Sequence, residues 1–214
     1  MSGSKGRAVG FTFRETMQGF VGPGDGFAAG QKAGKATGEH LRFRVTVAVD
    51  DLKAFLGDKE HNAEMSGTVD SGSLGTGMPI DGGTFKLFAR DERGHRTMQY
   101  RLPFTSAAGE TCLLEGYKDV HNDRTFDFWY DTTALFTTLH RPGGTNGEAS
   151  QLIGILRIRP IDLVPQVWSM RALHTRNPAR HLLALGRFGW FFASNILDEY
   201  RPGLGRKRKN GMSA

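Results

Sequence analysis

Apolar and polar residues alternate over most of the chain, in short segments separated by Gly, Asn, Asp and charged turns. A period of two is typical of β-strands that bury one face. The clearest example is the segment 41–49, where every second residue from Leu41 to Val49 is apolar. The same pattern predicts strands at 11–21, 65–71, 83–90, 96–104, 111–120, 131–141 and 151–159. The protein is therefore expected to be mainly β.

These segments follow one another with short polar connections such as residues 91–94, which is typical of an antiparallel meander. A succession of about eight or more strands needs closure or a second layer to remove its exposed edges. We therefore expect an antiparallel β-barrel, lipocalin-like in type, or a closed β-sandwich.

Two C-terminal helices are predicted after Pro160, where the apolar spacing changes to three and four residues. The first covers 161–173 with Asp162 as its N-cap, and the second begins at Pro178. The second helix carries a wide apolar stripe, which predicts that it is pressed into a groove or across a barrel mouth. The stripe comprises Leu182, Leu185, Phe188, Phe192 and Ile196, widened by Leu183, Trp190, Phe191 and Leu197.

The remaining segments contain turn signals. Residues 22–38 are rich in Gly, Ala and Lys without a sustained period, so we expect a long loop there. Residues 51–56 form a short helical turn that Asp50 or Asp51 can cap. The sequence therefore predicts a disordered N-terminus (1–10), one barrel-like domain (11–200) and a disordered basic tail (201–214).

Charge is unevenly distributed along the 214 residues, whose formal net charge is +6. Five of the 28 basic residues lie after Tyr200, where there is no acid, so the preceding part of the chain is nearly neutral. This distribution does not favour specific nucleic-acid binding, which needs a basic face. It allows weak contact between the tail and anionic surfaces.

Familiar catalytic and metal-binding signatures are absent from the sequence. It contains no GxGxxG, GxxxxGK[ST], HExxH, GxSxG or CxxC motif, and its seven histidines are scattered. The single cysteine, Cys112, lies in an apolar stretch and is expected to be an inert buried thiol. We expect no cofactor and no metal, and with no signal-like or membrane-spanning run we expect a cytoplasmic protein.

Candidate binding residues come from polar groups placed among apolar ones. Glu15 interrupts the apolar face of the first strand, and an aromatic-rich region follows residue 115. If these groups share a barrel interior, they form an apolar pocket with a few polar anchors, which suits a small hydrophobic or amphipathic ligand. The predicted ligand-binding residues are Glu15, Glu115, Tyr117, Trp129 and Arg157. The alternative is a buried network that joins Glu15 or Glu115 to Arg101 or Arg157 and serves the fold alone.

Several stretches together resemble an accessory module found beside glucose-methanol-choline flavin oxidoreductases of the cholesterol-oxidase type in actinobacteria. They are FRETMQGF (13–20), VDDLKAFLGDKEHNAEMSGTV (49–69), YRLPFTSAAGETCLLEGYKDV (100–120), DFWYDTTALFTTL (127–139) and GILRIRP (154–160). The resemblance covers most of residues 11–200. It implies a setting of sterol or lipid oxidation with a flavin oxidoreductase as partner. It assigns no catalytic residue, since the flavin-binding fingerprint is missing from this chain.

Three functions remain open at this point. The first is a noncatalytic module that binds a lipid-like or sterol-like ligand, or docks on an oxidoreductase that handles one. The second is an enzyme with an acid/base site built from Glu15, Glu115, Tyr117 or Asp131, which requires Glu15 and Glu115 to converge in one cavity. The third is an interaction module with a filled core and an exposed apolar patch on its last helix.

Deletion of residues 201–214 should leave the fold and any interior ligand binding unchanged, because the tail carries charge and no apolar pattern. Retention on a cation exchanger should fall, since the deletion removes most of the net positive charge. Far-UV circular dichroism and elution salt concentration test the two statements. A loss of β-structure in the shortened chain would contradict the prediction.

Overall fold

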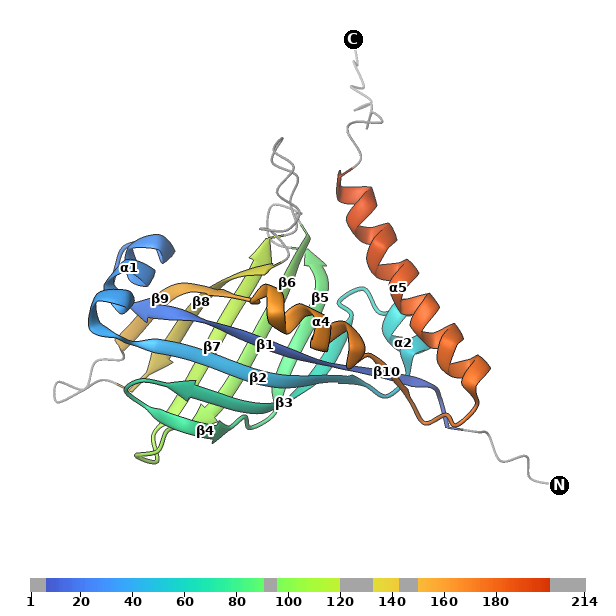
Figure 1. The fold of residues 1–214 in the computed structure, drawn as a ribbon, viewed down its shortest axis with the longest axis horizontal. Helices are drawn as coiled ribbons and strands as arrows, with labels where there is room; N and C mark the ends of the chain where they lie inside the picture. Colours follow the sequence, from blue (N-terminus) through green and yellow to red (C-terminus); the bar gives the residue numbers. More distant parts are fainter. Residues whose placement is uncertain (1–6, 91–95, 120–132, 143–149, 201–214) are drawn as a thin grey trace, which may run out of the picture.

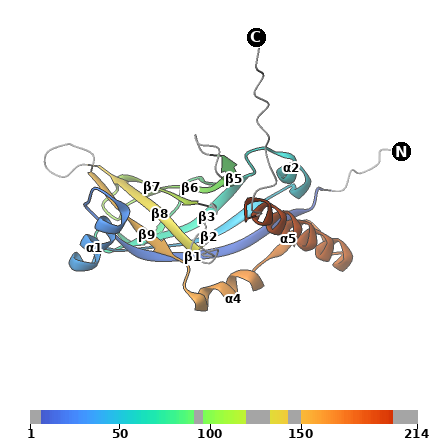
Figure 2. The same ribbon diagram turned by 90° about the horizontal axis from the view of Figure 1, so that it is seen from above.

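The computed structural model describes residues 7–90, 96–119, 133–142 and 150–200. Eight antiparallel strands form a closed barrel (Figures 1 and 2), which confirms the predicted fold class. The barrel strands are β1 (Gly10–Gly22), β2 (His40–Val49), β3 (Asn62–Ser71), β5 (Gly83–Arg90), β6 (Arg96–Thr105), β7 (Thr111–Asp119), β8 (Ala134–Arg141) and β9 (Ser150–Arg157). Pairing of β1 with both β2 and β9 closes the barrel.

In the described part of the chain, two further strands and four helices surround the barrel. Strand β4 (Gly75–Pro79) pairs with β3, and β10 (Arg171–Leu173) pairs with β1. The helices are α1 (Phe27–Thr37), α2 (Leu52–Gly57), α4 (Pro160–Trp168) and α5 (Pro178–Tyr200). Figure 1 shows α1 at one end of the barrel and α2 and α5 at the other, with α4 in front of β1.

The predicted alternation of strand residues is confirmed where it was clearest. In β2, the alternate residues from Leu41 to Val49 are all buried. In β1, Phe11, Glu15, Met17 and Val21 share the buried face. The barrel interior is thus built from every second residue of each strand, as a pleated sheet with one inward face requires.

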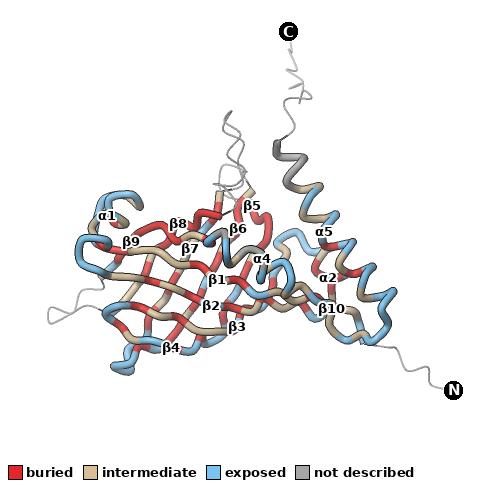
Figure 3. The backbone as a smooth tube through the Cα atoms, in the orientation of Figure 1, coloured by how far each residue is buried: buried red, intermediate tan, exposed pale blue. Residues whose placement is uncertain are grey.

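Packing inside the barrel differs between its two ends. The end beside α1 is filled by side chains that are almost completely buried, and Figure 3 shows buried stretches in red alternating with tan along its strands. These side chains include Val21, Leu41, Leu102, Phe104, Leu114 and Leu139. The other end, where β1 and β6 begin and β7 finishes, encloses a cavity.

Helix α1 corrects the expectation of a long loop over residues 22–38. Its two buried residues are Gly30 and Gly34, one helical turn apart. A Cβ atom at Gly34 would lie 2.2 Å from the carbonyl oxygen of Val21, and one at Gly30 would lie 2.2 Å from that of Ile153. The glycines therefore let the helix backbone lie directly on β1 and β9. A helix that packs through glycine has no apolar stripe, which is why periodicity missed it.

The first predicted C-terminal helix is shorter than expected, and a strand follows it. The helix expected over 161–173 is α4, which begins at Pro160 with Arg159 as N-cap and ends at Trp168. Residues 171–173 form β10 instead, opposite Gly10–Thr12 of β1. This part of β1 extends beyond its pairing with β9, so its free edge accepts another strand. Likewise, β4 lies between the predicted strands 65–71 and 83–90, where no strand was expected.

Two predicted helix starts are confirmed by their hydrogen bonds. Asp51 caps α2, since its Oδ1 accepts from the backbone N–H groups of Lys53 and Ala54 at 2.9 and 3.0 Å. Asn177 caps α5 in the same way, with its Oδ1 2.9 Å from the backbone nitrogen of Ala179. These side chains satisfy backbone donors that have no partner within the helix.

Aromatic contacts hold α5 against the barrel. Phe188 stacks on Phe11 of β1 with ring centroids 4.0 Å apart. Phe191 lies against Phe55 of α2, and Phe192 lies 5.5 Å from Phe88 of β5. The expectation that this helix lies across the barrel through its apolar stripe is confirmed for these aromatic residues. It is wrong for Leu182, Leu183 and Trp190 of the same stripe, which are exposed.

Substitution of Gly34 by Ala should destabilise the protein, although alanine favours helices by about 1 kcal/mol over glycine. The added Cβ would meet the Val21 carbonyl at 2.2 Å and push α1 off β1, with an expected net cost of about 1–3 kcal/mol. Urea denaturation measures the free energy of unfolding. Gly186→Ala is the matched control, because Gly186 lies inside helix α5 and nothing lies within 4 Å of its added Cβ. Equal stability of the two variants would contradict this account of α1.

Candidate functional site

A cavity of about 480 Å³ occupies the end of the barrel that α4 and α5 cover. Its wall is mainly apolar and combines inward side chains of the strands with side chains of both helices. They include Phe13, Leu87, Met98, Ile158, Leu185 and Phe188. Volume and lining are those of a small-molecule site, in which apolar walls supply most of the contact.

Three polar side chains meet at the wall of this cavity: Glu15 of β1, Tyr100 of β6 and Lys118 of β7. The Lys118 ammonium donates to Glu15 Oε1 at 2.7 Å, and the Tyr100 hydroxyl donates to Glu15 Oε2 at 2.9 Å. The side chains of Glu15 and Lys118 are only 2% and 3% exposed. The ion pair therefore crosses the barrel interior, between strands that are not neighbours in the sheet.

Lys118 has more donors than its partners use. An ammonium carries three N–H groups, and Glu15 is the only acceptor that contacts Lys118 among the described residues. Its nitrogen also lies 5.2 Å from the centre of the Tyr100 ring, which adds a cation–π attraction. An ammonium with unused donors in an apolar site favours any oxygen atom that can reach it.

Burial and the neighbouring Glu15 carboxylate raise the pKa of Tyr100 well above its ordinary value. Burial is the larger cause, because the phenolate would have to form without solvent. The carboxylate adds charge repulsion and holds the phenol proton in a hydrogen bond. Tyr100 therefore stays a neutral donor to Glu15 throughout the physiological pH range.

Gln166 places a second polar group at the cavity, from helix α4. Its Oε1 atom is buried and has no hydrogen-bond partner in the part of the chain that the structure describes. A buried acceptor without a partner costs free energy that a bound donor would recover. The cavity thus offers donors on Lys118 and an acceptor on Gln166.

The structure brings one of the predicted site residues into the cavity and leaves three elsewhere. Glu15 lines it, as expected. Glu115 and Tyr117 lie on the outer face of β7, with 45% of the Glu115 side chain and 40% of Tyr117 exposed. Arg157 is half-buried and is not part of the cavity lining, since in β9 Leu156 and the following Ile158 point inward. Trp129 lies outside the described residues.

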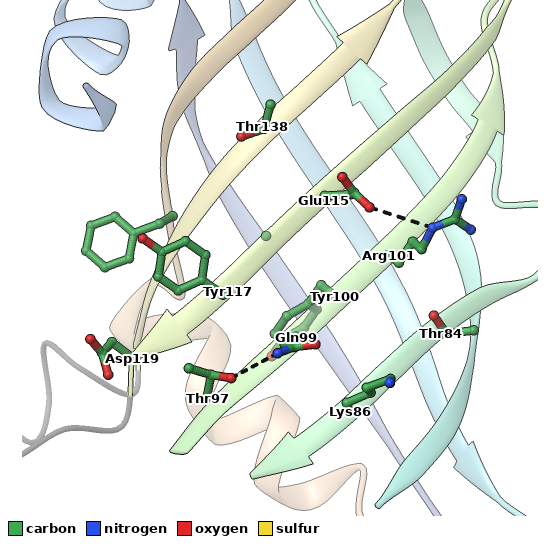
Figure 4. A pocket seen from close by; sticks show the side chains of 12 residues that line it. Thr84, Lys86, Thr97, Gln99, Tyr100, Arg101, Glu115, Tyr117, Asp119 and Thr138 are labelled. Carbon is green, nitrogen blue, oxygen red and sulfur yellow. Dashed lines mark hydrogen bonds and ion pairs between the residues drawn. The ribbon is translucent and has the colours of Figure 1, made fainter. Parts of the chain in front are cut away.

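Glu115 and Tyr117 instead border a broad groove on the outer surface of β5 to β8 (Figure 4), of about 660 Å³. Glu115 contacts Arg101 at 3.7 Å and His140 at 3.1 Å. Tyr117 packs against Phe136 of β8, with ring centroids 5.4 Å apart. The groove lies on the outer surface and its charged groups are paired in solvent, so it gives less support for a ligand site than the mainly apolar cavity inside the barrel.

The wrong placement of Glu115 and Tyr117 inside the barrel has a simple physical cause in strand β7. A strand has two faces, so the prediction had to choose between the face of Glu115 and Tyr117 and the face of Leu114 and Lys118. The charged lysine belongs to the inward face, because it neutralises Glu15 across the barrel. The carboxylate within the apolar face of β1 was the signal for such a partner. The choice of the wrong face of β7 is why Lys118 was not predicted as a site residue. Tyr100 and Gln166 were not predicted either.

These placements bear on the two alternative functions. Glu15 lies inside the barrel and Glu115 outside it, so the carboxylate pair required by the enzymatic alternative is not formed. Asp131 lies outside the described residues. The filled core required of an interaction module is also not observed, because the described residues enclose the cavity. The interaction module also requires an exposed apolar patch on the last helix, and Trp190 of α5 is 75% exposed.

Comparisons with known proteins do not identify this chain. No protein-family model matches it, and neither the curated proteins nor the solved structures contain a significant match. The resemblance to the module beside flavin oxidoreductases therefore stays a prediction. Within the described residues, no group of His, Cys, Asp and Glu could hold a metal ion, and no helix is long and apolar enough to cross a membrane.

Substitution of Tyr100 by Phe should lower the free energy of unfolding by about 1.5–3 kcal/mol at neutral pH, through loss of its hydrogen bond to the Glu15 carboxylate. The native pKa of Tyr100 is raised, so the unfolded chain loses this proton first and the wild-type protein should lose stability above about pH 10. The variant should show a smaller alkaline loss. Urea denaturation at neutral and alkaline pH measures both effects.

Tyr117→Phe is the matched control for the neutral-pH effect, because its hydroxyl makes no hydrogen bond among the described residues and its ring is 40% exposed. We expect it to retain wild-type stability at neutral pH. Equal losses in the two variants would show that the Tyr100 hydroxyl contributes nothing specific.

Proposed function

We propose that this chain binds a neutral amphipathic molecule, of the lipid or sterol class, inside its barrel. The observation that carries the proposal is the buried Lys118 ammonium, which faces an apolar cavity. Glu15 is its one partner among the described residues and does not use all of its donors. A ligand oxygen at this point would accept a charge-assisted hydrogen bond. The rest of the ligand would replace water along the apolar wall.

Charge balance favours a hydroxyl or carbonyl head group over a carboxylate. Glu15 and Lys118 already neutralise each other, so an added carboxylate would leave one uncompensated negative charge in a buried site. A hydroxyl can accept from Lys118 and also donate, and the free Oε1 of Gln166 is a suitable acceptor in the same cavity. A neutral alcohol therefore uses both polar features.

Binding can be followed by tryptophan fluorescence, because Trp168 and Trp190 belong to the helices that cover the cavity. The wild-type protein should give a saturable change with dodecanol and with cholesterol. It should bind dodecanol about tenfold or more tightly than dodecane, since one hydrogen bond to a charged donor is worth about 1.5–3 kcal/mol. Dodecanoic acid at neutral pH should bind less tightly than dodecanol.

The double variant Glu15→Gln/Lys118→Met tests the polar anchor without leaving one buried charge unpaired. It should still bind dodecanol through the apolar wall but lose most of the preference over dodecane. Lys86→Met is the matched control, because Lys86 makes an ion pair of the same 2.7 Å length with Glu60 on the outside of the barrel. It should keep the wild-type preference. Absence of saturable binding by the wild type, or equal affinity for dodecanol and dodecane, contradicts the proposal.

A further inference from the structure

Two exposed tryptophans are the sequence neighbours of residues at which the cavity reaches the surface. Val167 of α4 and Gly189 of α5 line the cavity and are also exposed, so they mark where it reaches the surface. The next residue after each is a tryptophan: Trp168 is 81% exposed and Trp190 is 75% exposed. Large aromatic side chains at such exposure, on both sides of one opening, form a surface that water solvates poorly.

Other apolar side chains extend this surface along both helices. Ile161 of α4 and Leu182 and Leu183 of α5 are exposed as well. Figure 2 shows α4 and α5 on the same side of the barrel, and both contact β1. We call the exposed apolar residues Ile161, Val167, Trp168, Leu182, Leu183 and Trp190 the portal surface.

Exposed arginines lie in the same C-terminal segment as the portal surface. Arg171, Arg176, Arg180 and Arg187 are exposed, and none has a carboxylate within ion-pair distance among the described residues. The only acid between residues 160 and 195 is Asp162, which Arg159 neutralises at 2.8 Å. A patch of tryptophan and leucine edged by unpaired arginines is complementary to an anionic bilayer, whose headgroups carry negative charge above an apolar layer.

We propose that the portal surface docks this protein on anionic membranes, with the cavity opening against the lipid. Trp168 and Trp190 enter the interfacial layer, and the four arginines contact lipid phosphates. The opening then faces the phase in which an amphipathic ligand is concentrated. Membrane docking is a property beyond ligand binding, and it can be measured with an empty cavity.

A second copy of this chain fits the portal surface less well. A two-fold dimer brings the same patch of each protomer together, so the unpaired arginines would face their own copies. Like charges at short distance oppose that arrangement. An anionic lipid surface satisfies the apolar and the cationic side chains at once.

Flotation with vesicles of phosphatidylcholine, with or without phosphatidylserine, tests the proposal on the full chain. The wild type should float with the anionic vesicles, and its tryptophan emission should shift to shorter wavelength on binding. Trp168→Ser/Trp190→Ser should weaken binding about tenfold or more, through loss of inserted apolar area. Arg180→Gln/Arg187→Gln should weaken it about fivefold per arginine, as expected for basic residues near an anionic surface.

Tyr117→Ser/Arg101→Gln is the matched control, because it removes an exposed aromatic ring and an exposed arginine from the outer groove instead. It should float as the wild type does. Circular dichroism of each variant shows whether it is folded. If the tryptophan variant is folded and floats as well as the wild type, binding comes from another part of the chain and the proposal is overturned.

Two more outcomes would also overturn the proposal. One is failure of the wild type to float with anionic vesicles. The other is a dimer in sedimentation velocity that Trp168→Ser/Trp190→Ser dissociates, since the portal surface would then bind a second copy. Dodecanol titration of the same variants in the absence of vesicles, measured by calorimetry because the tryptophan variant lacks Trp168 and Trp190, keeps the two proposals separate. Loss of flotation with retained dodecanol binding concerns the membrane surface alone.

Discussion

The ion pair between Glu15 and Lys118 is the interaction around which the hollow end of this barrel is organised. Both side chains are almost completely buried, so each depends on the other for charge neutrality. Removal of one partner from such a pair typically costs about 3–5 kcal/mol, because the remaining charge stays buried. The pair thereby links β1 to β7 through the barrel interior. It also places two charged groups in the otherwise mainly apolar wall of the cavity.

The strands could be read from the sequence because each buries one face. The alternation from Leu41 to Val49, for example, gave β2 almost to the residue. Helix α1 could not be read, since Gly30 and Gly34 pack through the absence of a side chain. Strand β10 exists only because β1 offers a free edge to it, and such a long-range cause leaves no local pattern.

The sequence predicted an apolar pocket with polar anchors inside the barrel, but only Glu15 among the predicted residues lines the cavity. Glu15 stood out because an acid among apolar residues needs a partner or a ligand. The identity of that partner depended on which face of β7 points inward. The prediction placed Glu115 and Tyr117 on the inner face, whereas Leu114 and Lys118 are the buried residues. Gln166 acquires its importance from the placement of α4 over the barrel, which no local pattern specifies.

Strand β10 also determines how the covering helices are attached. It joins α4 to α5 and pairs with β1 over only three residues, whereas each of the eight barrel strands is paired on both of its sides. The segment from α4 to α5 can therefore detach as a local cooperative unit while the barrel ladder stays hydrogen-bonded. Such detachment would widen the opening at Val167 and Gly189 and leave the barrel ladder intact, so exposure of the interior and global unfolding are separate events in this fold.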